Sequence, residues 1–290
     1  MLVSSLVDEA IDSFHMYSRE QPASTALTSM INDTDTTFTV ADASKLSTGL
    51  IQIEDEVLFV RSIDRASNTV ILEPWGRGLA GSTATSHGID ARIINAPAAP
   101  RARVRDMILQ VLHEIFPMVY AVDTAIISTN AAQVNYGLPN DVYSVLAVEY
   151  NPPGPTQSWH PLRRWRQNRT PTGVELEIIS PTTPGNNRVR VHYIKNAPNS
   201  LDMSDDLEAM GYPPSIRELV TLGVAVRLAA FAESVRVQVT GPESAARAEV
   251  VPAGSASGLS RYLYQLFRQR LDDEARNTQQ RYPIVTHFTR

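Results

Sequence analysis

The residues best suited to chemistry in this 290-residue sequence lie in a glycine-rich stretch and in an acidic turn before it. The stretch, from Trp75 to Gly88, reads WGRGLAGSTATSHG and combines glycines, hydroxyls, an arginine and a histidine. The acidic turn holds Glu54, Asp55 and Glu56. Such residue types could cradle a phosphate, form a nucleophilic triad or supply an acid/base pair.

The phosphate interpretation starts from GRGLAG, which matches GxGxxG through Gly76, Gly78 and Gly81. That fingerprint requires a helix directly after the glycines, inside a βαβ unit. Here STATSHGIDARII follows and returns to a strand pattern. The stretch also has no lysine for a phosphate-binding loop of the GxxxxGK[ST] type. The sequence therefore argues against a nucleotide site.

The catalytic interpretations are also weak. Ser82, His87 and Asp90 could form a triad, but GLAGS is not the GxSxG of a nucleophile elbow. Runs of charge are usually exposed, so we interpret the three carboxylates as a solvated turn between two strands. A hydrolase that uses Glu54, Glu56 and His87 stays open as an alternative.

The remaining interpretation of the stretch is structural. Glycines permit positive φ and close backbone approach. The hydroxyls, and His87 with them, are expected to satisfy backbone groups of a long ordered loop. The predicted structural loop consists of Gly76, Arg77, Gly78, Gly81, Ser82 and His87.

Metal and cofactor sites find little support. None of the six histidines pairs at a helical metal-ligand spacing, and there is no HExxH. The chain has no cysteine, which excludes disulfides, thiolate ligands and cysteine nucleophiles. We predict no catalytic residue, no cofactor, no metal and no enzymatic activity.

Composition limits the partners. Hydrophobic residues make up 43% and charged residues 20% of the chain, as in ordinary soluble proteins. The net charge of -5 disfavours a general nucleic-acid binder, which is normally basic. No apolar run is long enough for a membrane span, and the acidic N-terminus lacks a signal-peptide pattern. We expect synthesis in a host cytoplasm.

Hydrophobic periodicity alternates between helical and strand patterns along the chain. It predicts an α+β fold: a helical core with a long C-terminal helix, two inserted antiparallel β domains and an extended C-terminal tail. The expected parts are an N-terminal helix at 1–22, a small β-barrel or sandwich at 23–98, a core helix at 99–122, a second β domain at 123–200, a C-terminal helical core at 201–278 and a tail at 279–290.

Three helices have specific predictions. The first should bury Leu2, Leu6, Ala10, Ile11 and Phe14, and the core helix Val104, Met107, Ile108, Val111, Leu112, Ile115 and Phe116. The last should point Leu259, Tyr262, Leu263, Leu266 and Phe267 inward.

The helix that follows Pro214 is apolar almost all round. Ser215 and Glu218 have the spacing of a capping box at its start. Arg227 is its exception, and we expect it to meet a carboxylate or a neighbouring subunit.

The order of elements in the first β region carries a resemblance. A strand, an acidic E.E turn, a strand, RG..GS.A..H and a final strand resemble a module of tailed-phage virion proteins. The matching residues are Glu54, Glu56, Arg77, Gly78, Gly81, Ser82, Ala84 and His87.

The C-terminal half resembles the head-to-tail adaptor (connector) proteins of tailed phages. The similarity lies in YGLPNDVYSVLAVEY, in VRVHYIKNAPNSLDMSDDLEAMGYPPSIRELVTLGVAVRLAA, and in LSRYLYQLFRQRLDDEARNTQQRYPI. It implies a virion protein that forms a ring, twelvefold, under the portal protein. The ring would continue the DNA channel without sequence-specific binding and seat the next neck or tail protein. The tail would bind the portal through Arg281, Tyr282, Pro283, Ile284, Val285, His287, Phe288 and Arg290.

One alternative is another neck or minor tail protein, such as a stopper or a glycan- or receptor-binding component. Trp75, Trp159 and Trp165 could then stack on sugar rings. We expect them instead to pack the β cores, because aromatic side chains usually supply buried area.

Overall fold

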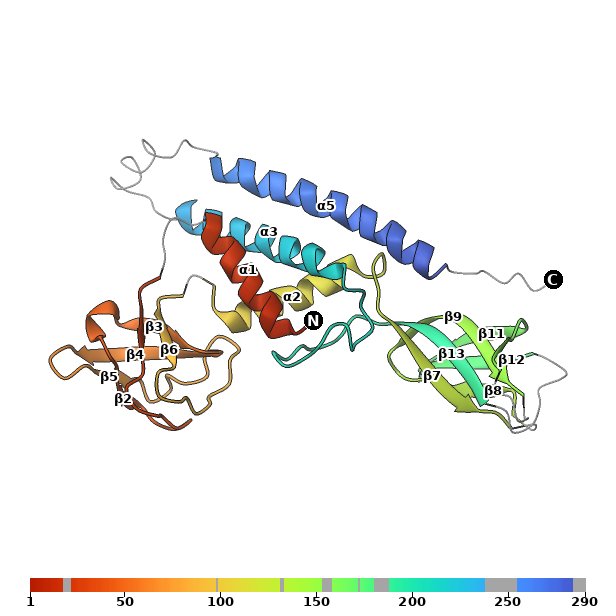
Figure 1. Cartoon of the computed structure of the whole chain (residues 1–290), viewed down its shortest axis with the longest axis horizontal. Helices are drawn as coiled ribbons and strands as arrows, with labels where there is room; N and C mark the ends of the chain where they lie inside the picture. The colour runs from red at the N-terminus through yellow and green to blue at the C-terminus, as the bar shows by residue number, and fades with distance from the viewer. Residues whose placement is uncertain are drawn as a thin grey trace.

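The computed structural model describes residues 1–17, 22–97, 99–130, 133–152, 158–171, 173–179, 188–237 and 255–283, and every structural statement refers to these. The molecule is elongated, with a β unit at each end and helices between them (Figure 1). The fold is therefore mixed α+β, with antiparallel sheets.

The middle of the molecule is a helical core of α1 (Val3–Tyr17), α2 (Arg101–Ile115), α3 (Ile216–Val237) and α5 (Ser255–Arg281). The predicted face of α2 is confirmed except at its margins, where Met107 and Phe116 are only partly buried. Its fully buried residues are Val104, Ile108, Val111, Leu112 and Ile115. They pack with residues of α1, α3 and α5 in one hydrophobic cluster.

The inward face of α1 differs from the prediction at its start. Leu2 precedes the helix, is exposed and forms a β-bridge with Asp206. Val3 and Val7 are buried instead, together with the predicted Leu6 and Ala10. Val3, Leu6, Val7 and Ala10 have the i, i+3, i+4, i+7 spacing of one helical face. The side chain of Phe14 lies outside the described part of the chain.

Helix α5 lies along α3 (Figure 1). A Cβ on Gly223 of α3 would lie 2.8 Å from the Val111 methyl groups and 3.0 Å from the Phe267 ring. The glycine thus allows α2, α3 and α5 to approach closely. Leu263 and Phe267 of α5 point inward as predicted, but Tyr262 and Leu266 are exposed, so their prediction was wrong.

The start of α3 is held differently from the predicted capping box. The Ser215 hydroxyl donates to the Glu274 carboxylate of α5. The Glu218 carboxylate pairs with Arg270 of α5 at 2.8 Å. Both polar groups therefore tie α3 to α5 rather than closing the first turn of α3.

One β unit is a six-stranded antiparallel sheet in the order β1-β6-β3-β4-β5-β2. Its strands are β1 (Ser24–Ala26), β2 (Thr37–Thr39), β3 (Gly49–Ile53), β4 (Glu56–Asp64), β5 (Thr69–Leu72) and β6 (Arg92–Asn95), with a 3-10 turn at Ala43–Lys45. A bridge between Leu27 and Val40 joins the ends of β1 and β2. The amide of Thr28 also donates to the Thr39 carbonyl at 3.1 Å. These contacts close the sheet into a small barrel with its own hydrophobic core.

The other β unit is a sandwich of two antiparallel sheets, ordered β10-β9-β13-β7 and β11-β12-β8. The strands are β7 (Val122–Ser128), β8 (Asn135–Gly137), β9 (Val142–Asn151), β10 (His160–Pro161), β11 (Trp165–Thr170), β12 (Gly173–Ile178) and β13 (Arg188–Lys195). Val145, Val148, Leu176, Val189 and Val191 fill the space between the sheets. Alternation along β13 buries one face, as its sequence pattern predicted.

The segment before α3 makes a close contact with the first strand of the sandwich. Gly211 has φ +98°, and its carbonyl accepts a hydrogen bond from the Val122 amide at 3.2 Å. A Cβ at this position would lie 2.3 Å from the Val122 carbonyl oxygen. Only glycine fits this junction without displacing the strand.

Candidate functional site

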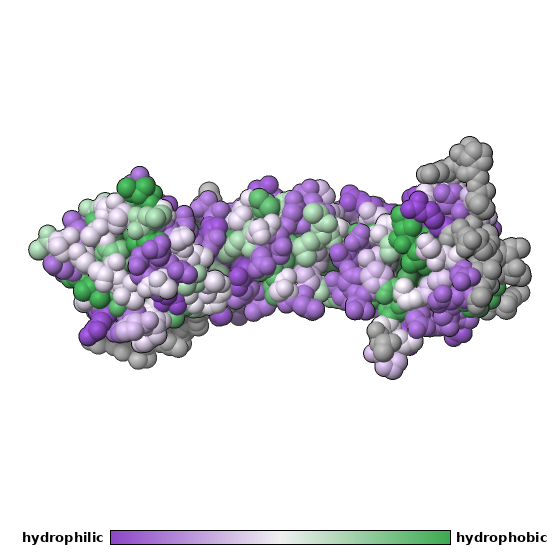
Figure 2. Space-filling model, turned by 90° about the horizontal axis from the view of Figure 1, so that it is seen from below, coloured by the Kyte–Doolittle hydropathy of each residue, from purple (hydrophilic) through white to green (hydrophobic). Residues whose placement is uncertain are grey.

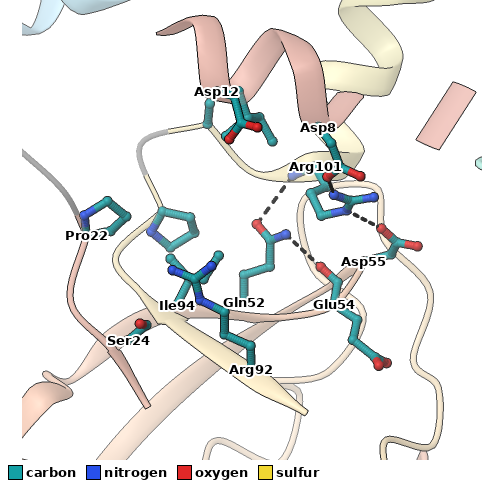
Figure 3. A pocket seen from close by; sticks show the side chains of 13 residues that line it. Asp8, Asp12, Pro22, Ser24, Gln52, Glu54, Asp55, Arg92, Ile94 and Arg101 are labelled. Carbon is teal, nitrogen blue, oxygen red and sulfur yellow. Dashed lines mark hydrogen bonds and ion pairs between the residues drawn. The ribbon is translucent and has the colours of Figure 1, made fainter. Parts of the chain in front are cut away.

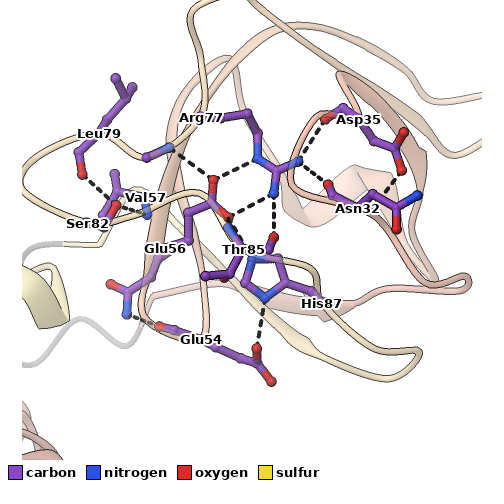
Figure 4. Close-up of polar contacts among 12 residues, drawn as sticks. Asn32, Asp35, Glu54, Glu56, Val57, Arg77, Leu79, Ser82, Thr85 and His87 are labelled. Carbon is purple, nitrogen blue, oxygen red and sulfur yellow. Dashed lines mark hydrogen bonds and ion pairs between the residues drawn. The ribbon is translucent and has the colours of Figure 1, made fainter. Parts of the chain in front are cut away.

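The carboxylate of Glu56, the first residue of β4, lies at the centre of a hydrogen-bonded network in the barrel. Its side chain is fully buried. Arg77 donates from Nε and Nη2 to the two carboxylate oxygens at 2.7 and 2.9 Å. The amides of Gly78 and Thr85 donate to the same oxygens at 3.0 and 3.1 Å (Figure 4). One carboxylate therefore gathers both ends of the glycine-rich loop.

His87 lies between two carboxylates. Its Nε2 is 2.8 Å from Glu56 Oε2, and its Nδ1 is 2.8 Å from Glu54 Oε2. Because both ring nitrogens face acceptors, the geometry favours an imidazolium that donates from both. Burial lowers the pKa of His87, but the hydrogen bonds to Glu56 and Glu54 outweigh it and raise the pKa above its usual 6.5.

The ionised form of Glu56 is stabilised in the same way. Burial acts to raise the pKa of this carboxyl. The hydrogen bonds from Arg77, His87 and the two amides act more strongly and lower the pKa to about 2. The buried group is thus a carboxylate at any pH near neutrality.

The remaining donors of Arg77 fix the surrounding loops. Its Nη1 donates to the carbonyls of Asn32 and Asp35 at 2.6 and 2.9 Å. Its Nη2 also donates to the Thr85 carbonyl at 2.7 Å. The planar guanidinium therefore joins the loop before β2, the start of β4 and the end of the glycine-rich loop, which suits the fixed fork of arginine.

Ser82 and three glycines complete the loop. The Ser82 hydroxyl accepts from the Val57 amide at 2.9 Å and donates to the Leu79 carbonyl at 2.7 Å. Gly78 and Gly81 have φ of +63° and +82°. A Cβ on Gly76 would lie 2.7 Å from the Phe59 carbonyl oxygen. Of the predicted structural loop, Arg77, Gly78 and His87 contact the Glu56 carboxylate. Ser82 satisfies backbone groups as expected, but the expectation for His87 was wrong, because its ring meets two carboxylates.

The interpretation of all three carboxylates as a solvated turn was wrong for Glu56. Glu54 and Asp55 are exposed, as a solvated turn requires, but Glu56 is buried. The charge pattern alone could not reveal this, because the two cations that permit the burial lie 21 and 31 residues further along the chain. The joint presence of Arg77 and His87 in the virion-module pattern was the available signal.

The same geometry limits the chemistry of the site. The side chains of Glu56 and His87 are almost completely buried. The two ring nitrogens of His87 contact the carboxylates of Glu54 and Glu56. The Ser82 hydroxyl is bonded to Val57 and Leu79, so the Ser82–His87–Asp90 triad is not assembled. The network holds the shape of the loop, and Glu54 is its exposed carboxylate.

A pocket of about 760 Å³ lies where the barrel meets α1 and the start of α2 (Figure 3). The guanidinium of Arg101 bridges Asp8 of α1 and Asp55 of the barrel. The buried side chain of Gln52 donates to the Glu54 carbonyl at 2.6 Å and accepts from the Arg101 amide at 3.3 Å. These groups are paired with one another, so polar contacts beside the pocket connect the barrel to the helical core.

The tryptophans differ in their surroundings. Trp165 packs partly against the sandwich core, as expected. Trp159 stacks with the Arg190 guanidinium, which lies 3.9 Å from the ring centroid. Trp75 is 61% exposed and has its ring 5.2 Å from that of Phe59, so its expected burial was wrong. Trp75 follows the end of β5 and does not belong to the hydrophobic core of the barrel.

The predicted tail is described only at its beginning. Arg281 ends α5, and Tyr282 and Pro283 follow it on the surface. The Tyr282 carbonyl accepts a hydrogen bond from the Tyr120 hydroxyl at 3.2 Å, which secures the end of α5. The other predicted tail residues, Ile284, Val285, His287, Phe288 and Arg290, lie outside the described residues.

Arg227 meets a carboxylate within its own chain. Its Nη2 lies 2.5 Å from Glu114 of α2, and its Nη1 donates to the Gly223 carbonyl at 3.1 Å. The residue therefore links α3 to α2. Its role at a subunit interface stays a prediction.

Among the described residues, no group of three or more His, Asp or Glu side chains is arranged to hold a metal ion. No described helix is both long and apolar enough to cross a membrane. Figure 2 shows the face turned away from α5, where hydrophobic residues gather on both β units and mix with polar ones over the helices.

The chain was compared with protein families, curated proteins and solved structures. No protein-family model matches the chain, and no curated protein does. A chain in a solved structure titled "Neck of empty GTA particle computed with C6 symmetry" is similar over 57% of this chain and 78% of that chain. The sequence identity is 14% and the TM-score is 0.23. The two chains do not superpose as whole molecules at that score.

Proposed function

We propose that this chain is a structural protein in the neck of a tailed-phage-like particle, where it acts as a head-to-tail adaptor. Many copies form a ring under the portal protein, continue the DNA channel and seat the next neck or tail protein. The observation that carries the proposal is a set of large side chains on α5 that the single chain leaves exposed.

Helix α5 has 27 residues and is therefore about 40 Å long. It packs mainly on α3, yet Tyr262, Tyr264 and Leu266 are 61%, 48% and 37% exposed. A surface helix of a monomer normally confines large apolar side chains to its buried face. Exposed groups of them mark interaction sites, so α5 is expected to be covered by another chain.

The rest of the molecule is consistent with a structural role. The Glu56 carboxylate and the His87 ring are buried, which suits a network that fixes the shape of the loop. The order of elements resembles the adaptor proteins, which supplies the kind of assembly and its position in the virion. In this proposal the chain has no enzymatic activity and no cofactor. Its net charge of -5 suits a channel through which DNA slides without being held.

The tail is proposed to bind the portal. Residues 284–290 read IVTHFTR and directly follow Pro283 at the end of α5. An extended β-prone segment can bind a partner by adding a strand to a sheet or by filling a groove. Because Tyr282 already contacts Tyr120, removal of the residues after Pro283 should spare α5 and its packing.

The test is an assembly assay with the portal protein of the same particle. Electron microscopy and native mass spectrometry should show rings of the full-length chain bound to portal, twelvefold on the adaptor hypothesis. A chain ending at Pro283 should keep its circular dichroism and its self-association but lose portal binding. If the full-length chain forms no oligomer and binds no portal, the adaptor function is refuted.

Exposed Trp75 favours a second candidate, a stopper or a glycan- or receptor-binding component of the neck or tail. Its ring lies beside Phe59, and Leu50 lies directly opposite Phe59 on β3. Such a group of apolar side chains can pack against a sugar ring. A glycan array should then show binding that Trp75→Ala abolishes and Trp159→Ala retains. An empty array excludes the glycan-binding form of this candidate.

A further inference from the structure

We infer that the molecule consists of two rigid bodies, and that the barrel turns against the rest of the chain on a polar joint at Arg101. The helical core and the sandwich form one body, and the barrel forms the other. The motion is a property of the single chain and does not depend on the proposed ring. It follows from a difference between the two junctions that connect the β units to the helices (Figure 1).

The junction between the sandwich and the helical core is apolar and closely packed. Tyr120, Leu146 and Ile194 are buried in one cluster, which joins the segment after α2 to β9 and β13. The hydrogen bond from the Val122 amide to the Gly211 carbonyl crosses the same junction, where only a glycine fits. An apolar interface of this kind holds two units in one orientation.

The junction between the barrel and the helical core has no such cluster among the described residues. The barrel core contains only barrel residues, and the cluster of the helical core contains none of them. Hydrogen bonds cross the junction instead. Arg101 donates from Nε to the Asp55 carboxylate at 2.5 Å and from its amide to Gln52 at 3.3 Å. The Arg105 guanidinium donates to the Gly81 carbonyl at 3.3 Å. Units joined by a small polar interface are expected to move relative to each other.

The pocket of about 760 Å³ lies in this junction and is lined from α1, from the barrel and from the start of α2 (Figure 3). Closely packed protein interiors contain few spaces larger than a water molecule. The open space therefore lets the barrel turn without first breaking apolar contacts.

Arg101 limits this motion because its guanidinium pairs with carboxylates of both bodies, Asp8 of α1 and Asp55 of the barrel. The Asp8 and Asp55 side chains are 57% and 53% exposed, so both ion pairs are weak and are screened by salt. Without the arginine, these two carboxylates would lie on opposite sides of the joint with no cation between them. The other charged side chains that line the pocket are Asp12, Glu54 and Arg92.

Double electron–electron resonance between paired spin labels tests this arrangement in the full-length chain, which has no native cysteine. One pair joins the barrel to α2 through Ser62→Cys and Gln110→Cys. The matched pair joins the sandwich to α2 through Ser128→Cys and Gln110→Cys. All three positions are exposed. The labelled chain is diluted into an excess of unlabelled chain, so that the distances measured lie within one copy.

The barrel pair should give a distribution of distances at least twice as wide as that of the sandwich pair. Arg101→Gln, or salt at about 1 M, should widen the barrel distribution further and leave the sandwich distribution unchanged. Arg103→Gln is the control, since Arg103 is exposed on the same helix and forms no ion pair within the described residues. Asp55→Asn keeps the pair between Arg101 and Asp8 and should act like Arg101→Gln. Circular dichroism checks that each variant is folded.

Equal widths for the two label pairs in the wild-type chain would overturn the two-body arrangement. A barrel distribution of the same width in Arg101→Gln and Arg103→Gln would overturn the assignment of the joint to Arg101. Failure of the wild-type chain to form rings would refute the proposed function and would leave these measurements unaffected.

Discussion

Replacing Glu56 by glutamine is the sharpest test of the ionic network in the barrel. The substitution keeps the size of the side chain but removes its charge. If the amide oxygen takes the place that accepts from Arg77 Nε and the Gly78 amide, the new NH2 group faces three donors. These are Arg77 Nη2, the Thr85 amide and the His87 ring. Two buried cations then lose their shared carboxylate.

The magnitude follows from the burial. Removing one partner of a buried ion pair typically costs about 3–5 kcal/mol, because the other charge remains desolvated. Glu54→Gln is the matched control, since the Glu54 carboxylate is 59% exposed and contacts His87 alone among side chains. Exposed ion pairs contribute less than about 1 kcal/mol. The two variants should therefore differ by at least about 2 kcal/mol in the free energy of opening the barrel.

Hydrogen exchange measured by mass spectrometry can separate the barrel from the helices and the sandwich. Peptides covering residues 49–95 should lose protection by about 100-fold or more in Glu56→Gln, since about 1.4 kcal/mol is a factor of ten. Peptides from α2 and β13 report on the rest of the fold and should be unchanged. A loss below tenfold in Glu56→Gln, or an equal loss in Glu54→Gln, would refute the structural role assigned to the buried carboxylate.

Two further predictions concern pH and the junction before α3. The raised pKa of His87 gives a stabilisation that is complete below pH 6.5 and is lost as pH rises through the raised pKa. The lowered pKa of Glu56 gives a stabilisation that is complete above pH 4.5 and is lost as pH falls toward 2. Urea midpoints of the barrel should accordingly be highest between these limits, and His87→Asn should remove the decline on the alkaline side; an unchanged alkaline slope in that variant would contradict the assignment. Gly211→Ala should lower the urea midpoint more than Gly49→Ala, because both have positive φ, at a strain of about 1–3 kcal/mol, but only the first adds a clash. Equal urea midpoints for the two alanine variants would contradict this prediction, because they would show that the backbone at Val122 shifts to relieve the clash.

Local patterns predicted the helices and strands because those patterns are set by neighbours in the chain. The face of α2 is an example, since Val104, Ile108 and Val111 recur at helical spacing and are all fully buried. Burial of Glu56 depends on Arg77 and His87, which lie far along the sequence. A local pattern of hydrophobic residues therefore could not predict this burial. Exposure of Tyr262 had a similar cause, because an apolar residue beside a helical stripe looks buried whether it faces its own core or another chain.

The site was less predictable than the fold for a related reason. The glycines of the loop could be assigned from backbone requirements, and Gly78 and Gly81 have the positive φ that such residues permit. The role of Arg77 depends on three segments that meet only after the barrel closes. A single sequence therefore identified the loop but not the carboxylate at its centre.

The position of α2 between the two β units has a consequence for how this protein can change. The barrel leaves and rejoins the helices between α1 and α2, and the sandwich does so between α2 and α3. Each has a separate hydrophobic core, and the 15 residues of α2 span about 22 Å between them. Either unit can therefore be enlarged, shortened or exchanged while α1, α2 and α3 keep their packing. A change in one β unit can therefore create a new binding surface at one end of the molecule while the contacts at the other end stay the same.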